Sequence, residues 1–103
     1  MPQALHGRLA QQGRLHQVVR DLYYPHETMV RLVRIAHGVA QRTGGEVTAA
    51  SFRDATGLGR KRAIQVLEYQ DRVGVLRRIG DLHRLRPDSA ILASCLQEQG
   101  LAT

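Results

Sequence analysis

Residues 48–86 read TAASFRDATGLGRKRAIQVLEYQDRVGVLRRIGDLHRLR, and the start and stop signals in this stretch predict the fold. Thr48 suits a helix N-cap, and we expect a short helix over Ala49 to Ala55 with Phe52 in the core. The two glycines of TGLG then predict a tight turn, and a second helix is expected from about Arg60 to Arg72. Two helices joined by so short a turn are the outline of a helix-turn-helix.

The residues that follow the second helix predict a β-hairpin. Two short apolar-rich segments, residues 75–79 and 82–86, flank Gly80-Asp81, and a glycine in the first position of such a turn favours type II′. In that register Leu76 lies opposite Leu85, which makes the two a natural core pair. A helix-turn-helix followed by this hairpin, here called the wing, is a winged helix. The expected fold class is α+β, mainly α with a small β-hairpin.

Upstream of this stretch, residues 25–41 predict the remaining helix of the same domain. Its apolar stripe consists of Met29, Leu32, Val33, Ala36, Val39 and Ala40. Gly44-Gly45 ends that helix, and residues 46–48 can supply a short strand that pairs with the wing. The complete domain is therefore expected over residues 25–87. Residues 88–103 form a C-terminal tail, in which an apolar cluster suggests a short helix.

The first 24 residues repeat part of the same pattern. Leu5 and Leu9 lie one helical turn apart, and a strand-like segment from Leu15, the dipeptide Arg20-Asp21 and a second apolar segment follow. The predicted wing has the same order of helix, strand, turn and strand. We expect these residues to be the last helix and wing of a preceding winged helix whose front half is missing. An independent N-terminal hairpin is the alternative.

The charge of the chain favours a polyanionic partner. Fifteen basic and nine acidic residues in 103 give a net charge of +6, with a pI near 10.7. Nine of the bases and four of the acids fall between Arg53 and Arg86, so this stretch holds +5 of the excess. A single cysteine, Cys95, excludes an internal disulfide, and no apolar run is long enough to span a bilayer or to act as a secretory signal. We expect a cytoplasmic protein without membrane contact.

The strongest candidate site is Gly59-Arg60-Lys61-Arg62 at the start of the second helix. Unpaired N–H groups and the positive end of the helix dipole face an incoming phosphate there, and Gly59 lets a ligand backbone approach closely. Cations at a helix N-terminus lower helix stability, so a purely structural role is disfavoured. Arg53 can join this surface, or can pair with Asp54 or Glu46. On the wing, the candidates for either nucleic-acid contact or ordinary exposed strand charge are Arg77, Arg78, His83 and Arg84.

No catalytic, metal or cofactor site is expected. The five histidines lie ten or more positions apart, so none has a second ligand at metal-binding spacing. Cys95 has no nearby base to activate it, and we interpret it as a small packing residue. The chain contains no Gly-x-x-x-x-Gly-Lys-Ser/Thr phosphate loop, which excludes GTP chemistry.

Several motifs resemble one known family. EVTAA (46–50) and FRDATGLGRKRA (52–63), followed by LEY, DRVG, RR and the Gly-Asp turn of the wing, with RDLYY (20–24) upstream, are similar to the C-terminal winged helix of SelB. SelB is the family of selenocysteine-specific translation elongation factors of bacteria. The similarity covers about residues 15–87 and lies mostly at polar positions that a fold alone does not dictate.

The resemblance implies a chain that ends in tandem winged helices behind a GTPase part. In that family the last winged helix binds the stem-loop (SECIS) in selenoprotein mRNA that recodes UGA. GTP, selenocysteyl-tRNA and the ribosome are further partners, and the resemblance implies that parts absent from this chain bind them. We therefore expect this chain to be the carboxyl-terminal fragment of such a factor and not itself an enzyme.

Recognition of RNA competes with a second function, that of a double-stranded-DNA-binding transcription regulator whose second helix enters the major groove. No helix fits the narrow major groove of A-form RNA, so an RNA-binding domain should present the helix start to a loop and its backbone. The residues expected on the exposed face of the second helix carry two acids and no cation, and are Gln65, Glu68, Tyr69 and Asp71. This face favours RNA, and we expect residues 1–24 to be unnecessary for the contact. A protein-interaction domain ranks third, because the +5 stretch argues against it.

Overall fold

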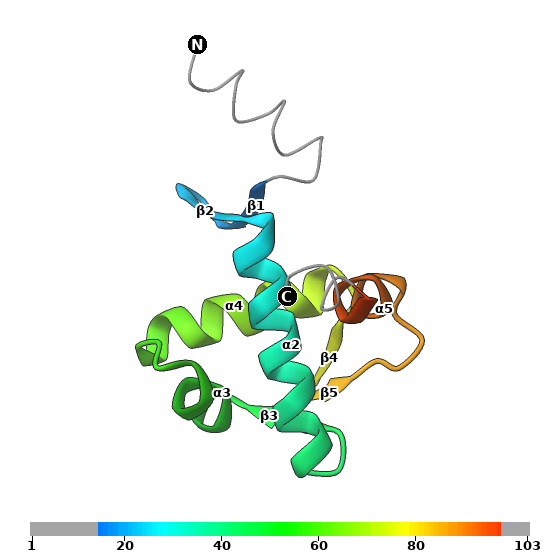
Figure 1. Cartoon of the computed structure of the whole chain (residues 1–103). Coiled ribbons are helices and arrows are strands. Elements are labelled where there is room, and N and C mark those ends of the chain that lie inside the picture. Colours follow the sequence, from blue (N-terminus) through cyan, green and yellow to red (C-terminus); the bar gives the residue numbers. More distant parts are fainter. Residues whose placement is uncertain (1–14, 98–103) are drawn as a thin grey trace.

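The computed structural model describes residues 15–97, whose arrangement is drawn in Figure 1. In chain order the elements are β1 (Leu15–Val19), β2 (Leu22–Pro25), α2 (His26–Arg42), β3 (Glu46–Thr48), α3 (Ala49–Thr56), α4 (Arg60–Arg72), β4 (Leu76–Ile79), β5 (Leu82–Leu85) and α5 (Ala90–Gln97). Figure 1 shows α2 crossing in front of α4, with α3 to one side of α2 and the wing strands and α5 to the other. The predicted winged helix is confirmed. The helix predicted near Leu5 lies outside the described residues.

The helix-turn-helix forms because its first helix has strong local start and stop signals. Thr48 caps α3, since its hydroxyl accepts a hydrogen bond from the Ser51 N–H at 3.1 Å while the Thr48 N–H donates to Ser51 Oγ at 2.9 Å. Gly57 ends α3 in the left-handed conformation, with φ of 78°. Phe52 is fully buried, as predicted. These signals fix where α3 begins and ends, and the turn after Gly57 leads to the start of α4 at Arg60.

The buried face of α4 differs in part from the predicted one. Ala63 and Leu67 are buried as expected, but Ile64 is only half-buried and Val66 belongs to the core. The reason is helical spacing, because Val66, Leu67 and Gln70 follow Ala63 at the i+3, i+4 and i+7 positions of one face. Gln70 is fully buried, and neither polar atom of its side chain has a hydrogen-bond partner within the described residues.

The wing belongs to a three-stranded antiparallel sheet with the order β3-β5-β4. Leu76 pairs with Leu85, which is the predicted register. Gly80, the first turn residue, has φ of 62°, a conformation that glycine adopts at little cost. The predicted strand over residues 46–48 is confirmed as β3, and its central residue Val47 is fully buried. Through β3 the wing is tied to the helices that precede it.

The helix α2 supplies the largest part of the core. All six residues of its predicted apolar stripe are buried, and Val30 is buried with them. Pro25 is the N-cap of this helix rather than a residue of its first turn. Gly44 and Gly45, with φ of 72° and 96°, turn the chain from α2 into β3. No helix within residues 15–97 combines the length and the apolar character that crossing a membrane requires.

The β1–β2 hairpin and α5 pack on the same core as the winged helix. Val18 on β1 is fully buried, and its carbonyl accepts a hydrogen bond from Arg72 Nη2 at 2.6 Å. His16 Nδ1 lies 2.7 Å from the hydroxyl oxygen of Tyr69, also on α4. The buried residues of α5 belong to the same cluster and lie against α2. The core therefore extends on both sides beyond the segment 25–87 that the sequence marks as the complete domain.

Candidate nucleic-acid interface

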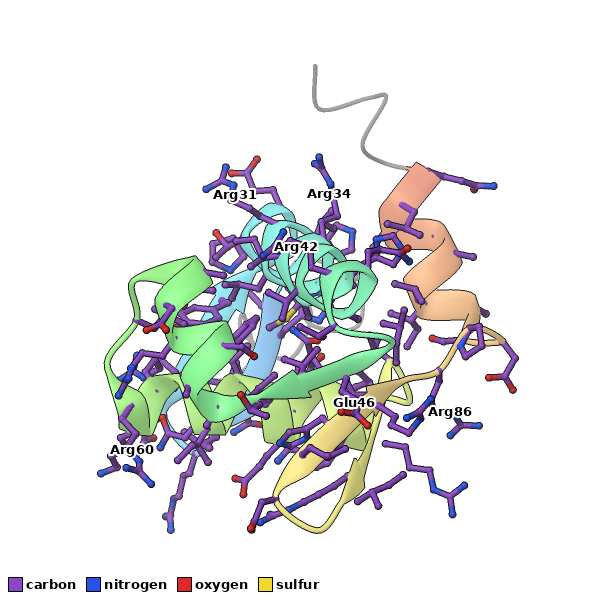
Figure 2. All side chains as sticks on the ribbon, turned by 90° about the horizontal axis from the view of Figure 1, so that it is seen from below. Arg31, Arg34, Arg42, Glu46, Arg60 and Arg86 are labelled. Carbon is purple, nitrogen blue, oxygen red and sulfur yellow. The ribbon has the colours of Figure 1, made fainter. Side chains whose placement is uncertain are left out.

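The start of α4 is the most exposed concentration of positive charge in the helix-turn-helix. Gly59 is the N-cap and contributes no side-chain cap, and the first intrahelical bond runs from the Ala63 N–H to the Gly59 carbonyl at 2.9 Å. The preceding N–H groups of the helix are therefore available to an anion. Arg60, Lys61 and Arg62 are exposed, and none of them makes an ion pair within residues 15–97. Figure 2 shows Arg60 projecting away from the molecule at this corner.

Gly59 itself leaves the approach to this helix start open. A Cβ atom added at Gly59 would meet nothing within 4 Å, and the φ of this residue is −65°, which any residue can adopt. Neither packing nor backbone conformation therefore requires a glycine here. Because glycine has no side chain, the N–H groups at the start of α4 stay accessible at this position.

The turn of the β1–β2 hairpin borders the same site. Residues 19–22 of the hairpin line an open hollow together with residues 59–62 and Gln65 at the start of α4. The sequence analysis did not place Arg20 beside this helix start, because it assigned residues 1–24 to a neighbouring module and expected them to be unnecessary for the contact. The available signals were the similarity of the Arg20-Asp21 turn to the wing turn and the place of RDLYY (20–24) in the family resemblance, and neither shows the surface against which the hairpin packs.

The wing arginines differ in how far their charge is already compensated. Arg78 Nη1 lies 3.5 Å from a carboxylate oxygen of Glu68 on α4, and Arg84 Nη1 lies 3.2 Å from a carboxylate oxygen of Glu46 on β3. Arg77 is exposed and has no ion pair within the described part of the chain. Of the three, Arg77 is the one whose guanidinium is free to take a phosphate without first leaving a carboxylate.

The structure removes His83 from the exposed surface and corrects its expected position. This residue is only 7% exposed, and its Nδ1 lies 2.9 Å from both carboxylate oxygens of Asp71 at the end of α4. Alternation along β5 explains the placement, because His83 shares its side of the strand with Leu85, two residues away. The Asp71–His83 contact joins the wing to α4, with the His83 ring in the interior between them.

Arg53 forms an ion pair with Asp54, which is one of the two pairings that the sequence analysis gave as an alternative to a ligand contact. Its Nε lies 3.7 Å from the carboxylate of Asp54, its neighbour on α3. Both side chains are largely exposed, so this pair is weak and screened by salt. Arg53 does not line the hollow at the start of α4. It lies at the edge of the candidate interface, with a charge that is partly compensated.

Beyond its first turn, α4 carries one further cation, Arg72, whose guanidinium donates to the Val18 carbonyl and lies over the Tyr69 ring. Glu68 and Asp71 are engaged by the wing, and Tyr69 is half-buried against His16 rather than exposed as expected. Burial raises the pKa of the Tyr69 phenol, while the neighbouring Arg72 guanidinium acts in the opposite direction. The phenol therefore stays neutral and can act as a hydrogen-bond donor. Within residues 15–97 no group of three or more His, Cys, Asp or Glu side chains is arranged to hold a metal ion.

Comparison with known proteins points to one family. Residues 39–85 match the family model described as "Elongation factor SelB, winged helix". Among curated relatives, the selenocysteine-specific elongation factor of Escherichia coli (strain K12) is 46% identical over 77 residues, which cover 75% of this chain and 12% of the relative. That of Haemophilus influenzae is 38% identical over 74 residues, which cover 72% of this chain and again 12% of the relative. The chain thus spans about an eighth of the length of the curated relatives it matches.

One solved structure provides a comparison in three dimensions. It is described as the mRNA-binding domain of elongation factor SelB from E. coli in complex with SECIS RNA. This chain is 44% identical to it, with a TM-score of 0.73. The match covers 78% of this chain and 65% of that one.

Proposed function

The chain belongs to the SelB family of selenocysteine-specific elongation factors, and from that premise we propose that its winged helix is an RNA-binding module for an mRNA stem-loop, the SECIS element that directs selenocysteine incorporation at UGA. The E. coli structure to which it is similar is described as a complex with SECIS RNA. The proposal extends that binding to this chain.

The observation that carries the proposal is the group of uncompensated cations at the start of α4. Arg60, Lys61 and Arg62 stand next to the positive end of the helix dipole without any carboxylate within ion-pair distance in residues 15–97. This placement costs stability, on the order of 0.3–1 kcal/mol per charge at a helix terminus. A bound phosphate group reverses the sign of that interaction, because an anion at a helix N-terminus is stabilised by the dipole, the free N–H groups and the cations together.

The same arrangement supports RNA over duplex DNA. A recognition helix in a major groove needs cations or amides along its outward face. Beyond its first turn, that face of α4 offers the amide of Gln65 but also two acids, Glu68 and Asp71, which are held by Arg78 and His83 of the wing. Cations without an ion pair in residues 15–97 gather at the helix start, and the wing adds Arg77. A loop with splayed bases and an exposed backbone presents its phosphates to such a surface.

We assign the contact residues in two groups. The group at the helix start consists of Gly59, Arg60, Lys61 and Arg62, with Arg20 on the facing hairpin turn. The second group consists of the wing arginines Arg77, Arg78 and Arg84, with Arg53 at the edge. His83 is a positioning residue, since it holds the wing through Asp71.

In the longer factor, we infer that this module supplies the mRNA contact. GTP, selenocysteyl-tRNA and the ribosome are the further partners that the family implies, and we assign their binding to other parts of the factor. The β1–β2 hairpin is interpreted as the wing of a preceding winged helix, docked on α4. Such a factor works in the cytoplasm, where translation takes place.

The test is filter binding of the whole chain to a SECIS stem-loop RNA and to a duplex DNA of equal length at the same salt concentration. We expect tighter binding to the stem-loop, and we expect Arg62→Ala to weaken it by about 1–3 kcal/mol, the usual loss for one specific contact. Arg86→Ala is the control, because Arg86 is also an exposed arginine but lies outside the assigned contacts and pairs with Asp88 at 3.7 Å. Tighter binding to the duplex DNA would replace the proposal with the DNA-binding alternative.

A further inference from the structure

A second row of arginines lies on the outward face of α2. Arg31, Arg34 and Arg42 project from this helix in Figure 2, on the opposite side of the molecule from Arg60. Helical spacing explains the row, because positions 31, 34, 38 and 42 differ by three or four residues and so share one face. The opposite face of α2 is buried in the core. We call the three arginines and Gly38 the α2 arginine face.

Within residues 15–97, no carboxylate compensates the positive charge of this face. None of Arg31, Arg34 and Arg42 forms an ion pair with any residue between 15 and 97. Arg78, Arg84 and Arg86, by contrast, each lie within 4.0 Å of a carboxylate. Glu27 lies on the same helix, one turn before Arg31. It stands in the first turn of α2, where the helix dipole favours its negative charge.

Gly38 lies in the middle of this face, and neither packing nor backbone conformation requires a glycine there. A Cβ atom added there would meet only the tip of the flexible Arg42 side chain, at 3.8 Å, which is ordinary contact. Its φ does not lie in the left-handed region. A glycine inside a helix lowers its stability relative to alanine, so the residue weakens α2 without helping its packing. Because Gly38 has no side chain, the helix backbone between the arginines is uncovered, and a partner can approach it closely.

The dimensions and surroundings of the face fit a nucleic-acid backbone. Eleven residues separate Arg31 from Arg42, a rise of about 16 Å along the helix, enough to meet several phosphates of one strand. Beside it, Arg31, Arg34 and His37 line an open hollow between α2 and α5, with Ile35 and Leu96 completing its wall. Guanidinium groups suit this ligand because each presents a planar fork of donors to a phosphate.

We propose that the α2 arginine face binds the phosphate backbone of a second RNA segment, double-stranded and recognised without regard to sequence, while the start of α4 holds the stem-loop. The two surfaces lie on opposite sides of the domain, so one small stem-loop does not occupy both. The domain then bridges two RNA segments. This inference goes beyond the proposed function and does not depend on which stem-loop occupies the α4 site.

The test uses the whole chain and two RNA probes, a SECIS stem-loop and a perfectly paired duplex of about 16 base pairs. The triple variant Arg31→Gln/Arg34→Gln/Arg42→Gln should lose at least tenfold in duplex affinity at low salt. The slope of log affinity against log salt should become shallower by about 2–3, since each lost phosphate contact contributes roughly 0.7–0.9. Its affinity for the stem-loop should stay within twofold of the unsubstituted chain.

Three controls keep the result interpretable. The triple Arg→Lys variant at the same positions retains the charge and should keep duplex affinity within about threefold, because backbone binding is mainly electrostatic. Arg60→Ala/Lys61→Ala should show the reverse pattern, weaker stem-loop binding with duplex binding retained. Gly38→Ala should raise the melting temperature while weakening duplex binding at least twofold. Melting curves of every variant establish that it is folded.

Three outcomes would overturn the inference. The first is a triple Gln variant that binds the duplex within twofold of the unsubstituted chain. The second is full competition between duplex and stem-loop, with no ternary complex in a gel-shift experiment, because a single surface then binds both. If the stem-loop fails to bind at all, the proposed function fails, but the duplex measurement still decides the role of α2. Capture by anionic lipid vesicles without duplex binding would also reject RNA as the partner.

Discussion

Replacing Arg60 and Lys61 by alanine tests the interface most directly, because both side chains are exposed and lie outside the buried face of α4. Five cations around the site have no ion pair within the described residues: Arg20, Arg60, Lys61, Arg62 and Arg77. With roughly 0.7–0.9 per phosphate contact, these five predict a slope of about −3.5 to −4.5 in log affinity against log salt. Removing two of them should make the slope shallower by about 1.4–1.8.

The double variant should also bind more weakly at every salt concentration. One specific nucleic-acid contact is worth about 1–3 kcal/mol, so losing two should cost about 2–6 kcal/mol in stem-loop affinity. The fold should gain a few tenths of a kcal/mol, because two cations leave the positive end of the α4 dipole. The assay is filter binding at four salt concentrations, with a melting curve on the same preparation. An unchanged slope and affinity together with a lower melting temperature would refute the reasoning and make these residues structural.

Further outcomes follow from particular contacts. His83→Ala should lower stability by about 1–3 kcal/mol, since it leaves the Asp71 carboxylate without its partner in the wing; an unchanged denaturation midpoint would argue against that contact. Gln70→Leu should raise stability by about 1 kcal/mol, because it removes two buried polar atoms that have no partner within the described residues, and a loss of stability would mean that the amide is hydrogen-bonded in solution. Arg20→Ala should weaken stem-loop binding by about 1–3 kcal/mol without changing the melting temperature, and equal affinity would restrict the site to α4 and the wing.

The elements of the winged helix were predictable because their signals are local. The N-cap at Thr48, the left-handed glycine at Gly57, and the Gly80 turn each act within a few residues, and the structure places the helix and strand ends within one or two residues of the predicted ones. The register of the wing followed from its two-residue turn. The buried face of α4 was harder, because Ile64 and Val66 are both apolar and only the helices packed against α4 decide which of them enters the core.

Charge composition located the candidate interface but did not show which charges are free. The cluster from Arg60 to Arg62 could be predicted, since it depends on consecutive residues at a helix start. The pairing of Arg78 with Glu68 and of Arg84 with Glu46 joins residues 10 and 38 positions apart. Such distances along the chain leave no local pattern, so the wing arginines looked equivalent until the sheet and α4 were placed.

What the sequence determined by itself was therefore the fold class, the order of its elements and the cluster of cations at the start of α4, because capping, turn chemistry and helical periodicity act over a few residues. Only the tertiary structure decided that His83 faces Asp71 in the interior, that the Arg20 turn lies beside the α4 start, and that the α2 arginines occupy the opposite side. Each of these depends on how separate segments pack around one core. That packing is settled by the burial of apolar surface over the whole molecule, and no short stretch of residues encodes it.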